Sequence, residues 1–204
     1  MTQIADRRVR RTRRNLAEAL VGLILERGYE RVTVQDILDR ADVGRSTFYA
    51  HFRDKEALLL SCFDGLGEEL ARDLDEMTPG RMPQDPAQPS LAIFSHASRH
   101  RKVYRALCGR QGGPVVQRHL HDLLAGLVTT HLAPHLATPE ARVPAPVVTE
   151  HYVSALLGVL TWWVRQDFPY QPAEMARMFG LLANPGVMTA IGRLPYPEPN
   201  QSLP

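Results

Sequence analysis

Apolar residues recur at the spacing of an α-helix along almost the whole chain, and this periodicity is the strongest constraint on its fold. Leu16, Leu20, Leu23 and Ile24 follow the i, i+4, i+7, i+8 pattern of one helix face. A longer stripe of the same kind consists of Leu59, Phe63, Leu66, Leu70 and Leu74. No segment has the strict apolar–polar alternation of a half-buried strand. The sequence therefore predicts an all-α protein.

Glycine and proline residues divide this pattern into about eight predicted helices. Gly28 ends the first one as a left-handed cap would, and Pro114 suits the first position of another. Residues 78–90 contain four prolines, which exclude a continuous helix, and residues 134–146 form a second irregular connection. Four helices are expected near residues 93–107, 116–128, 147–166 and 172–182. The last ten residues also contain four prolines and are expected to lack regular structure.

Two short predicted helices, 34–41 and 45–51, form the pattern that points to a function. The residues between them leave room only for a tight turn. Thr33 can cap the first short helix, and Asp36 stands three residues later, as in a variant of the capping box. A long amphipathic helix precedes both. This succession is typical of a helix-turn-helix unit, whose second short helix enters the major groove of DNA.

Basic charge is concentrated at the front of the chain, although the net charge is only +2. Residues 1–55 hold 12 Lys and Arg against 8 Asp and Glu, whereas residues 56–204 hold 12 against 14. Six arginines fall within eight positions: Arg7, Arg8, Arg10, Arg11, Arg13 and Arg14. Such a cluster is a common footprint for a phosphate backbone. On charge alone, a solvated and fraying terminus fits equally well.

The second short helix has one polar side that is available for DNA. Arg45 can donate two hydrogen bonds to guanine, and Ser46 and Thr47 can reach base edges or phosphates. Tyr49, His51 and Lys55 suit phosphate oxygens, which position a protein without reading sequence. Phe48 and Phe52 are spaced i, i+4 and can pack inward. The same pattern also fits a small helical bundle that has no nucleic-acid partner.

One stretch of the chain also resembles a known family. Residues 28–29, 32–37 and 43–58 read GY, VTVQDI and VGRSTFYAHFRDKEAL. Together they resemble the TetR family of bacterial transcriptional repressors, and the TFYxHFxxKExL core is highly specific to that family. Residues 162–163, 168–169 and 172–176 are similar, with lower specificity, to the C-terminal region of one subgroup of regulators.

The resemblance implies a three-helix DNA-binding head over residues 1–55, with a basic arm at 1–14. A larger helical domain for effector binding and dimerisation then covers 56–191, and a proline-rich tail covers 192–204. The implied function is a dimeric, sequence-specific transcriptional regulator, a repressor that a small-molecule effector releases from a palindromic operator. We accordingly expect a cytoplasmic protein that is not an enzyme and holds no cofactor or metal.

Site residues carry over only at matching positions. The resemblance implies that Thr33 caps its helix and touches the DNA backbone, and that His51 and Lys55 lie at phosphates. The residues implied to face the major groove are Arg45, Ser46, Thr47 and Tyr49.

Two positions depart from the family pattern. Asp42 replaces the usual turn glycine but tolerates left-handed backbone, and Gly44 replaces a Ser or Ala, so it offers no side chain to a phosphate.

Residues farther along the chain are expected to form the dimer and the effector site. Ser154, Gly158 and Thr161 form a small-residue ridge on an almost wholly apolar helix, which lets a second helix approach closely. The next helix adds Met175, Met178 and Phe179, and the two helices could build a four-helix bundle across a two-fold axis. The resemblance places a largely apolar pocket among the middle helices. Each residue that could line this pocket is also consistent with an ordinary position in the hydrophobic core. These residues are Phe63, Leu66, Phe94, Tyr104, Leu107, Cys108, Leu124, Val128, Tyr152 and Trp162.

Several alternatives remain at this point. The i, i+4 pairs His96/His100 and His131/His135 could bind one metal ion. Neither pair has a Cys or carboxylate nearby in sequence to complete a site, so surface or capping histidines are favoured. Cys62 and Cys108 could form a redox switch but fit inert core thiols better. The longest mainly apolar stretch has 13 residues, fewer than the roughly 20 of a membrane span. A non-specific DNA-coating protein and a helical enzyme or ligand carrier also remain open.

Overall fold

The computed structural model describes residues 2–77, 88–109, 112–131 and 138–195. Within these ranges all regular secondary structure is helical, which confirms the predicted all-α fold class. Most of the predicted connection at 78–90, part of 134–146 and the tail beyond residue 195 lie outside the described residues.

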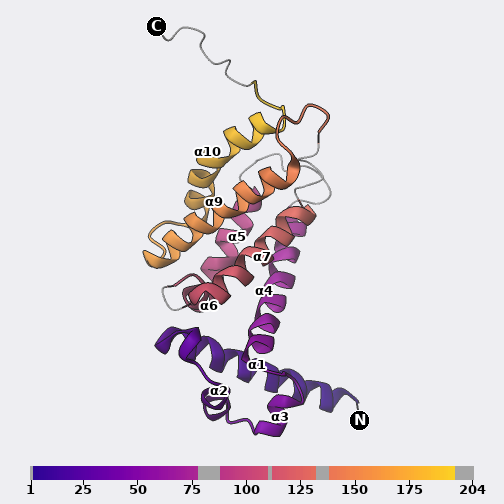
Figure 1. The fold of residues 1–204 in the computed structure, drawn as a ribbon, viewed down its shortest axis with the longest axis vertical. Helices are drawn as coiled ribbons and strands as arrows, with labels where there is room; N and C mark the ends of the chain where they lie inside the picture. The colour runs from indigo at the N-terminus through magenta and orange to yellow at the C-terminus, as the bar shows by residue number, and fades with distance from the viewer. Residues whose placement is uncertain (1, 78–87, 110–111, 132–137, 196–204) are drawn as a thin grey trace.

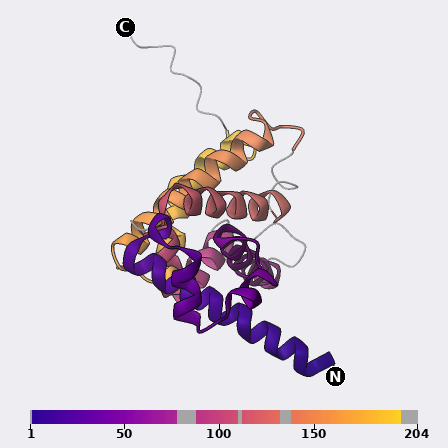
Figure 2. The same cartoon turned by 60° about the horizontal axis from the view of Figure 1, so that its bottom comes forward.

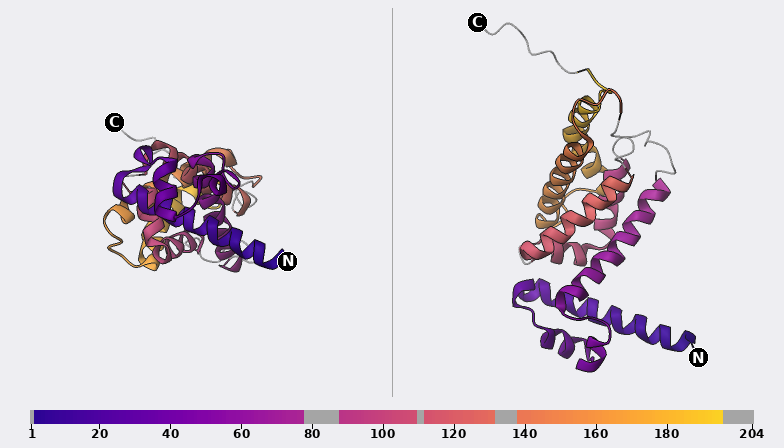
Figure 3. Two further views of the ribbon diagram at one scale, coloured as in Figure 1. Left: turned by 90° about the horizontal axis from the view of Figure 1, so that it is seen from below. Right: turned by 45° about the vertical axis from the view of Figure 1, so that its right-hand side comes forward.

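The first three helices and a short 3-10 helix form the lower part of the molecule (Figure 1). They are α1 (Thr2–Arg27), η1 (Tyr29–Arg31), α2 (Val34–Ala41) and α3 (Arg45–Tyr49). α1 lies across this part, and its N-terminal end projects beyond the other helices in both views of Figure 3. Leu16, Leu20, Leu23 and Ile24 are fully buried, as their spacing predicted.

The predicted end of the second short helix was two residues too late. α3 ends at Tyr49 because the chain turns back there: the amides of His51 and Phe52 both donate to the carbonyl of Phe48, at 2.9 and 2.8 Å. Gly28 also differs in detail. Its φ of 83° needs a glycine, as predicted, but its ψ of 148° is extended and not left-handed helical.

The remaining helices form the upper body, and α4 (Lys55–Met77) runs from the lower part into it (Figures 1 and 2). The body contains α5 (Gln88–Arg99), α6 (Arg101–Cys108), α7 (Gly113–His131), α9 (Ala145–Arg165) and α10 (Pro172–Ala190). α10 packs against α5 and α9, and α7 packs against α4 and α9. Two elements of the body, α4 and α6, contact α1 below.

The single helix predicted near residues 93–107 is in fact two. The backbone at His100 leaves the helical region, with φ −110° and ψ 39°, and this separates α5 from α6. The amide of His100 still bonds the carbonyl of His96, at 3.0 Å, and the amide of Tyr104 bonds the carbonyl of His100, at 3.1 Å. These two hydrogen bonds span the bend and the apolar spacing continues through it, so the spacing alone did not reveal the corner.

An aromatic cluster holds the centre of the body together. Trp163 is fully buried, lies edge-on to Phe94 and Phe168 at ring-centroid distances of 5.4 and 4.7 Å, and donates its indole N–H to the carbonyl of Tyr170 at 3.0 Å. Phe168 has φ 58°, a conformation that bulky side chains rarely adopt. Its burial between Trp163 and the guanidinium of Arg101, 4.2 Å from the Phe168 ring centre, stabilises that turn.

α9 is long and apolar enough to cross a membrane by length and composition. Its buried side chains include Tyr152, Leu156, Leu160 and Trp163, all of which pack in the core of the body. The helix therefore has the burial pattern of a core element with one outward face.

The adjacent tryptophans provide a direct test of this packing. Trp163→Ala removes a fully buried ring and should lower the free energy of unfolding by about 3–5 kcal/mol. Trp162, which is 47% exposed and stacks on Tyr170, serves as the matched control, and its substitution by alanine should cost about 1 kcal/mol or less. Urea unfolding measures both variants. Equal losses would contradict the assignment of Trp163 to the centre of the core.

Candidate nucleic-acid interface

The turn between α2 and α3 has the geometry that its sequence predicted. Asp42 is left-handed, with φ 51° and ψ 52°, and its amide bonds the carbonyl of Leu38. The aspartate therefore supports the turn in place of a glycine. Gly44 begins α3 without a side-chain cap, and a Cβ added there would meet nothing within 4 Å.

Thr33 and Asp36 form the predicted capping box at the start of α2. The amide of Asp36 donates to the Thr33 hydroxyl at 3.2 Å, and the Thr33 amide and hydroxyl donate to the Asp36 carboxylate at 2.8 and 2.6 Å. Arg27 at the end of α1 adds a bond of 3.0 Å to the same carboxylate. The hydrogen bonds from Thr33, followed by the charge of Arg27, hold the pKa of Asp36 below its usual value.

A second ion pair joins α1 to α2. Arg40 donates two hydrogen bonds of 2.7 Å to the two carboxylate oxygens of Glu26, and the pKa of Glu26 is lowered chiefly by this contact. Together with the Arg27–Asp36 bond, it sets the position of α2 against α1. Sequence spacing gave no sign of this pair, since its members lie 14 residues apart on different helices.

α3 presents its predicted polar face to solvent. Phe48 is fully buried and Phe52 nearly so, whereas the side chains of Arg45, Ser46, Thr47 and Tyr49 are exposed. Tyr49 is 50% exposed, and its ring lies edge-on to that of Phe48, with centroids 5.3 Å apart. The structure therefore places four of the seven predicted DNA-binding residues together on one outward surface.

Arg45 has a partner on α2 that its sequence position did not predict. Its guanidinium donates to the Gln35 side-chain oxygen at 3.1 Å, and the Gln35 amide group donates to Asp39 at 2.7 Å. This relay across α2 and α3 restricts where the guanidinium points. Arg45 therefore lies at the surface in an oriented position, with its other donors free to contact a base edge.

The other two predicted phosphate contacts are less open. His51 is half-buried beside Phe52, while Lys55 points inward. The Lys55 ammonium donates to the carbonyls of Tyr29 and Val32 at 3.0 and 2.9 Å and lies 4.4 Å from the centre of the Tyr29 ring. In this position Lys55 joins the start of α4 to the end of η1, and it does not present its charge outward as the resemblance implied.

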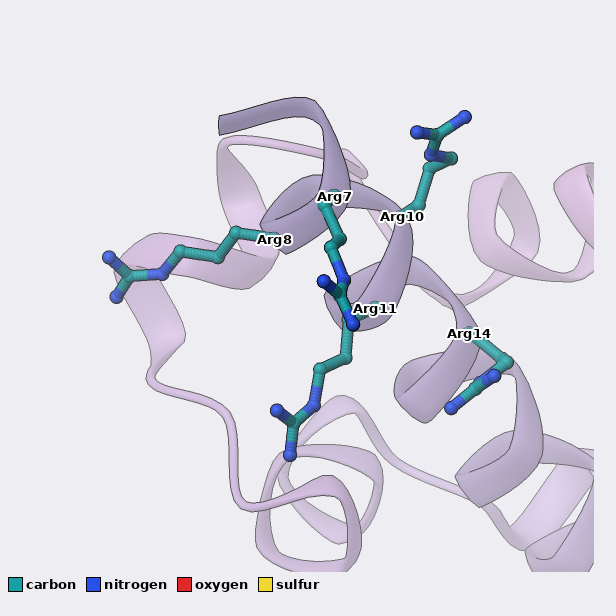
Figure 4. Close-up of a pocket in the computed structure, with 5 residues that line it drawn as sticks. All are labelled: Arg7, Arg8, Arg10, Arg11 and Arg14. Carbon is teal, nitrogen blue, oxygen red and sulfur yellow. The ribbon is translucent and has the colours of Figure 1, made fainter. Parts of the chain in front are cut away.

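The arginine cluster lies on a folded helix. Arg7, Arg8, Arg10, Arg11 and Arg14 surround a hollow of about 680 Å³ on α1. Figure 4 shows Arg7 and Arg11 extending along the same side of the helix, with Arg8 and Arg10 to either side. Arg13 lies apart from them, with its guanidinium 5.3 Å from the centre of the Phe52 ring. The resulting surface is positively charged and borders the helix-turn-helix unit.

Nine of the ten predicted effector residues lie in the core, and they come from α4, α5, α6, α7 and α9. Trp162 does not join them, because it faces outward and stacks on Tyr170. Close packing is evident between α4 and α7, where a Cβ at Gly67 would lie 2.7 Å from Leu123. A hollow of about 530 Å³ lies elsewhere, between α10 and Leu91 of α5.

The predicted dimer residues divide into two groups. Ser154 and Gly158 are exposed on α9, and Thr161 and Met178 are partly exposed. Met175 and Phe179 are 2% and 1% exposed, so the structure does not support their assignment to a dimer surface. They belong to the core of their own chain, where Phe179 packs on Phe94 and Tyr152. The outward apolar residues of α10 are Leu181 and Leu182, at 66% and 78% exposure.

Cys62 and Cys108 were an alternative candidate for a redox switch, and the pair His131/His135 for a metal site. Burial raises the pKa of Cys62 to about 11 and that of Cys108 to about 12, so both thiols are poorly reactive at neutral pH. The side chain of His131 and the whole of His135 lie outside the described residues.

Comparison with known proteins supports this interpretation of the geometry. The family model described as "Bacterial regulatory proteins, tetR family" matches residues 16–62, and that described as "Transcriptional regulator C-terminal region" matches residues 84–185. The HTH-type transcriptional regulator YxbF of Bacillus subtilis is 30% identical over 183 residues, which cover 85% of this chain. The chain spans 45% of that relative, less than half of its length.

Solved structures show the same fold. A TetR transcriptional regulator from Streptococcus agalactiae aligns with a TM-score of 0.65 at 22% identity and covers 90% of this chain and 99% of its own. A putative regulator of the same family from Syntrophomonas wolfei aligns with a TM-score of 0.66 at 16% identity and covers 91% and 98%. The relatives described here are transcriptional regulators, and such proteins are not enzymes.

Lys55 can be tested against the other lysine of the chain. Lys55→Ala removes a charged donor from two carbonyls and should lower the free energy of unfolding by about 1.5–3 kcal/mol. Lys102→Ala is the matched control, since this side chain is exposed, and should change stability by about 0.5 kcal/mol or less. Urea unfolding compares the two. A Lys55 variant as stable as the wild type would overturn the inward, structural role of this residue.

Proposed function

Because the chain belongs to the TetR family, whose members are generally DNA-binding repressors, we propose that it is a dimeric, sequence-specific transcriptional repressor. The observation that carries the proposal is the outward face of α3, where Arg45, Ser46, Thr47 and Tyr49 lie together over a buried Phe48. Members of the family are soluble cytoplasmic proteins, and we propose the same location here.

In this proposal α3 enters the major groove and α1 supplies phosphate contacts. Arg45, oriented by Gln35, reads a guanine, and Ser46 and Thr47 contact neighbouring base edges or phosphates. Tyr49 and the arginines that surround the hollow on α1 bind phosphate oxygens. Thr33 and His51 lie beside this surface and touch the DNA backbone. Residues 1–55 act as the DNA-binding head and residues 56–191 as the body.

A second copy of the chain is required because one short helix buries too little surface for tight binding. Two recognition helices about 34 Å apart can read two half-sites of a palindrome on one face of the duplex. We propose that α9 and α10 form the dimer surface. Val147, Ser154, Gly158 and Trp162 form its exposed stripe on α9, and Met178 and Leu182 supply its apolar part on α10.

Release from DNA is proposed to follow binding of a mostly apolar small molecule among the body helices. The core residues that could contact it come from five helices, among them α4, which begins in the head at Lys55. An effector that separates these helices would move α4 and change the spacing of the two heads. Switching from nearly full to nearly absent occupancy needs a differential affinity of about 10⁴-fold. Because coupling is reciprocal, DNA must weaken effector binding by the same factor.

DNA binding tests the head directly. Fragments selected from genomic DNA by the wild-type protein provide the specific site, which should bind at least ~10³-fold more tightly than random DNA. Arg45→Ala should lose about 10–100-fold on that site and relax the preference at one base position. Tyr49→Ala should weaken specific and random DNA alike. Arg72→Ala, at an exposed arginine in the body part of α4, is the control and should change neither affinity.

Two results would count against this function. Equal affinity for selected and random DNA would favour a non-specific DNA-coating protein. An Arg45→Ala variant that loses affinity uniformly would show that Arg45 binds phosphate and does not read a base.

Dimer formation can be tested with two equivalent glycines. Gly158 on α9 and Gly126 on α7 are both exposed and helical, and a Cβ at either would meet nothing within 4 Å. Gly158→Arg should convert the dimer to a monomer and weaken operator binding, whereas Gly126→Arg should leave both unchanged. Analytical ultracentrifugation measures the mass. A Gly158→Arg protein that remains dimeric would exclude this stripe from the interface.

A further inference from the structure

Three side chains with metal-binding atoms meet at the surface of the body, away from the DNA-binding head. They are Glu69 on α4, His96 on α5, and His100 at the corner between α5 and α6. Their ligand atoms all lie within 4.8 Å of one another. The Glu69 Oε2 atom is 3.2 Å from His100 Nε2 and 3.6 Å from His96 Nε2. The sequence offered the two histidines, and the fold supplies the carboxylate from 27 positions earlier.

His96 is the most informative member of this cluster. Its side chain is fully buried, and its Nε2 atom has no hydrogen-bond partner among the residues that the structure describes. A buried polar atom that lacks a partner is rare in native proteins and calls for an explanation, such as an ion. The unpartnered nitrogen points into the cluster, toward the Glu69 carboxylate, and the centres of the His96 and His100 rings are 4.4 Å apart.

The other nitrogen of His96 sets the state of the ring. Nδ1 lies 3.0 Å from the hydroxyl of Tyr104, which is itself buried. If Nδ1 carries the proton and donates it to this hydroxyl, Nε2 keeps a free lone pair. Burial, followed by the nearby His100, lowers the pKa of His96 and favours the neutral imidazole. A ligating histidine with its second nitrogen held by another side chain is the usual arrangement around protein-bound metals.

We propose that Glu69, His96 and His100 bind a divalent transition-metal ion of the zinc class. Imidazole and carboxylate donors suit Zn²⁺. Tetrahedral coordination at 2.0–2.1 Å places ligand atoms ~3.3 Å apart. The two measured distances to Glu69 Oε2 are close to this value, and the half-exposed His100 can rotate to shorten the third. Since Glu69 and His100 are both partly exposed, the fourth position faces solvent and can hold a water molecule or another small ligand.

A plain ion pair explains the cluster less completely. A contact between Glu69 and His100 accounts for two of the three groups but leaves His96 Nε2 buried and unpartnered. The neighbouring charges are already matched, because Arg99 pairs with Asp73, one turn beyond Glu69 on α4. Glu69 is the carboxylate that contacts both histidines, which is suited to a cation that all three groups share.

The position of the site also suggests a consequence for regulation, which rests on the proposed DNA-binding function. The metal would join α4 to the α5–α6 corner, and both α4 and α6 contact α1 of the head. Zn²⁺ binding is therefore positioned to change the placement of the head relative to the body, and with it the affinity for DNA.

The site is tested first without DNA. Full-length protein is freed of metal with EDTA, dialysed, and titrated with Zn²⁺ alone by calorimetry. One ion should bind per chain, and Zn²⁺ at about a hundred times its Kd should raise Tm by about 5–10 °C. Co²⁺ in its place should give the intense visible absorption of a tetrahedral N/O site. His100→Ala and Glu69→Gln should each weaken Zn²⁺ binding at least ~10-fold and abolish the Co²⁺ band.

Two further variants keep the result interpretable. Tyr104→Phe retains the core ring and should weaken Zn²⁺ binding about 10-fold by removing the partner of His96 Nδ1. His121→Ala is the matched control, because His121 also pairs with a glutamate, Glu150, but outside the cluster, and it should bind Zn²⁺ like the wild type. The site would be overturned if the wild type did not bind Zn²⁺, or if the Glu69→Gln and His100→Ala variants bound Zn²⁺ as tightly as the wild type.

Coupling to DNA is measured separately. Affinity for the selected DNA fragment should change at least threefold when Zn²⁺ is added to the wild type and should not change in His100→Ala. Zn²⁺ binding without any change in DNA affinity would retain the site but overturn its regulatory role. If neither the wild type nor His100→Ala bound DNA, with or without Zn²⁺, the proposed function would be contradicted, whereas the metal site would stand.

Discussion

The burial of Phe48 is the interaction on which the DNA-facing surface depends. A helix of five residues is not stable in water on its own, because too few hydrogen bonds repay the ordering of its backbone. α3 exists because Phe48 and Phe52 pack into the core beneath α1, and the turn after Tyr49 closes on the carbonyl of Phe48. With Phe48 pointing inward, the side chains of Arg45, Ser46, Thr47 and Tyr49 remain exposed around it. One buried ring therefore orients the whole recognition surface.

The same head is held together by polar contacts at its edges. The capping box of Thr33 and Asp36, the Arg27–Asp36 bond and the paired bonds of Arg40 to Glu26 place α2 on α1. Lys55 binds the end of η1 to the start of α4. Since α4 continues into the body, it connects the body to a head whose own contacts are short and well matched. This arrangement suits the proposed regulator, in which α4 and α6 both connect the body to the head.

Local features were predicted well because short-range physics produces them. Apolar spacing located the helices, Thr33 and Asp36 marked the start of α2, and Asp42 was correctly expected to be left-handed. The predictions failed where distant residues decide the outcome. Met175 and Phe179 lie on the inward side of α10 because α5 and α9 pack there, while Leu182 remains exposed. Trp162 and Trp163 are neighbours with opposite environments, and composition could not distinguish them.

The fold class and the outward residues of the head could be predicted from helical periodicity, capping residues and the spacing of Phe48 and Phe52. These properties act within one or two helical turns, so a linear chain records them. The inward position of Lys55, the break at His100 and the meeting of Glu69 with His96 and His100 arise from contacts between residues up to 31 positions apart. Only the packed arrangement of α4 with η1, α5 and α6 decides them, because burial and hydrogen-bond partners depend on which helices come together.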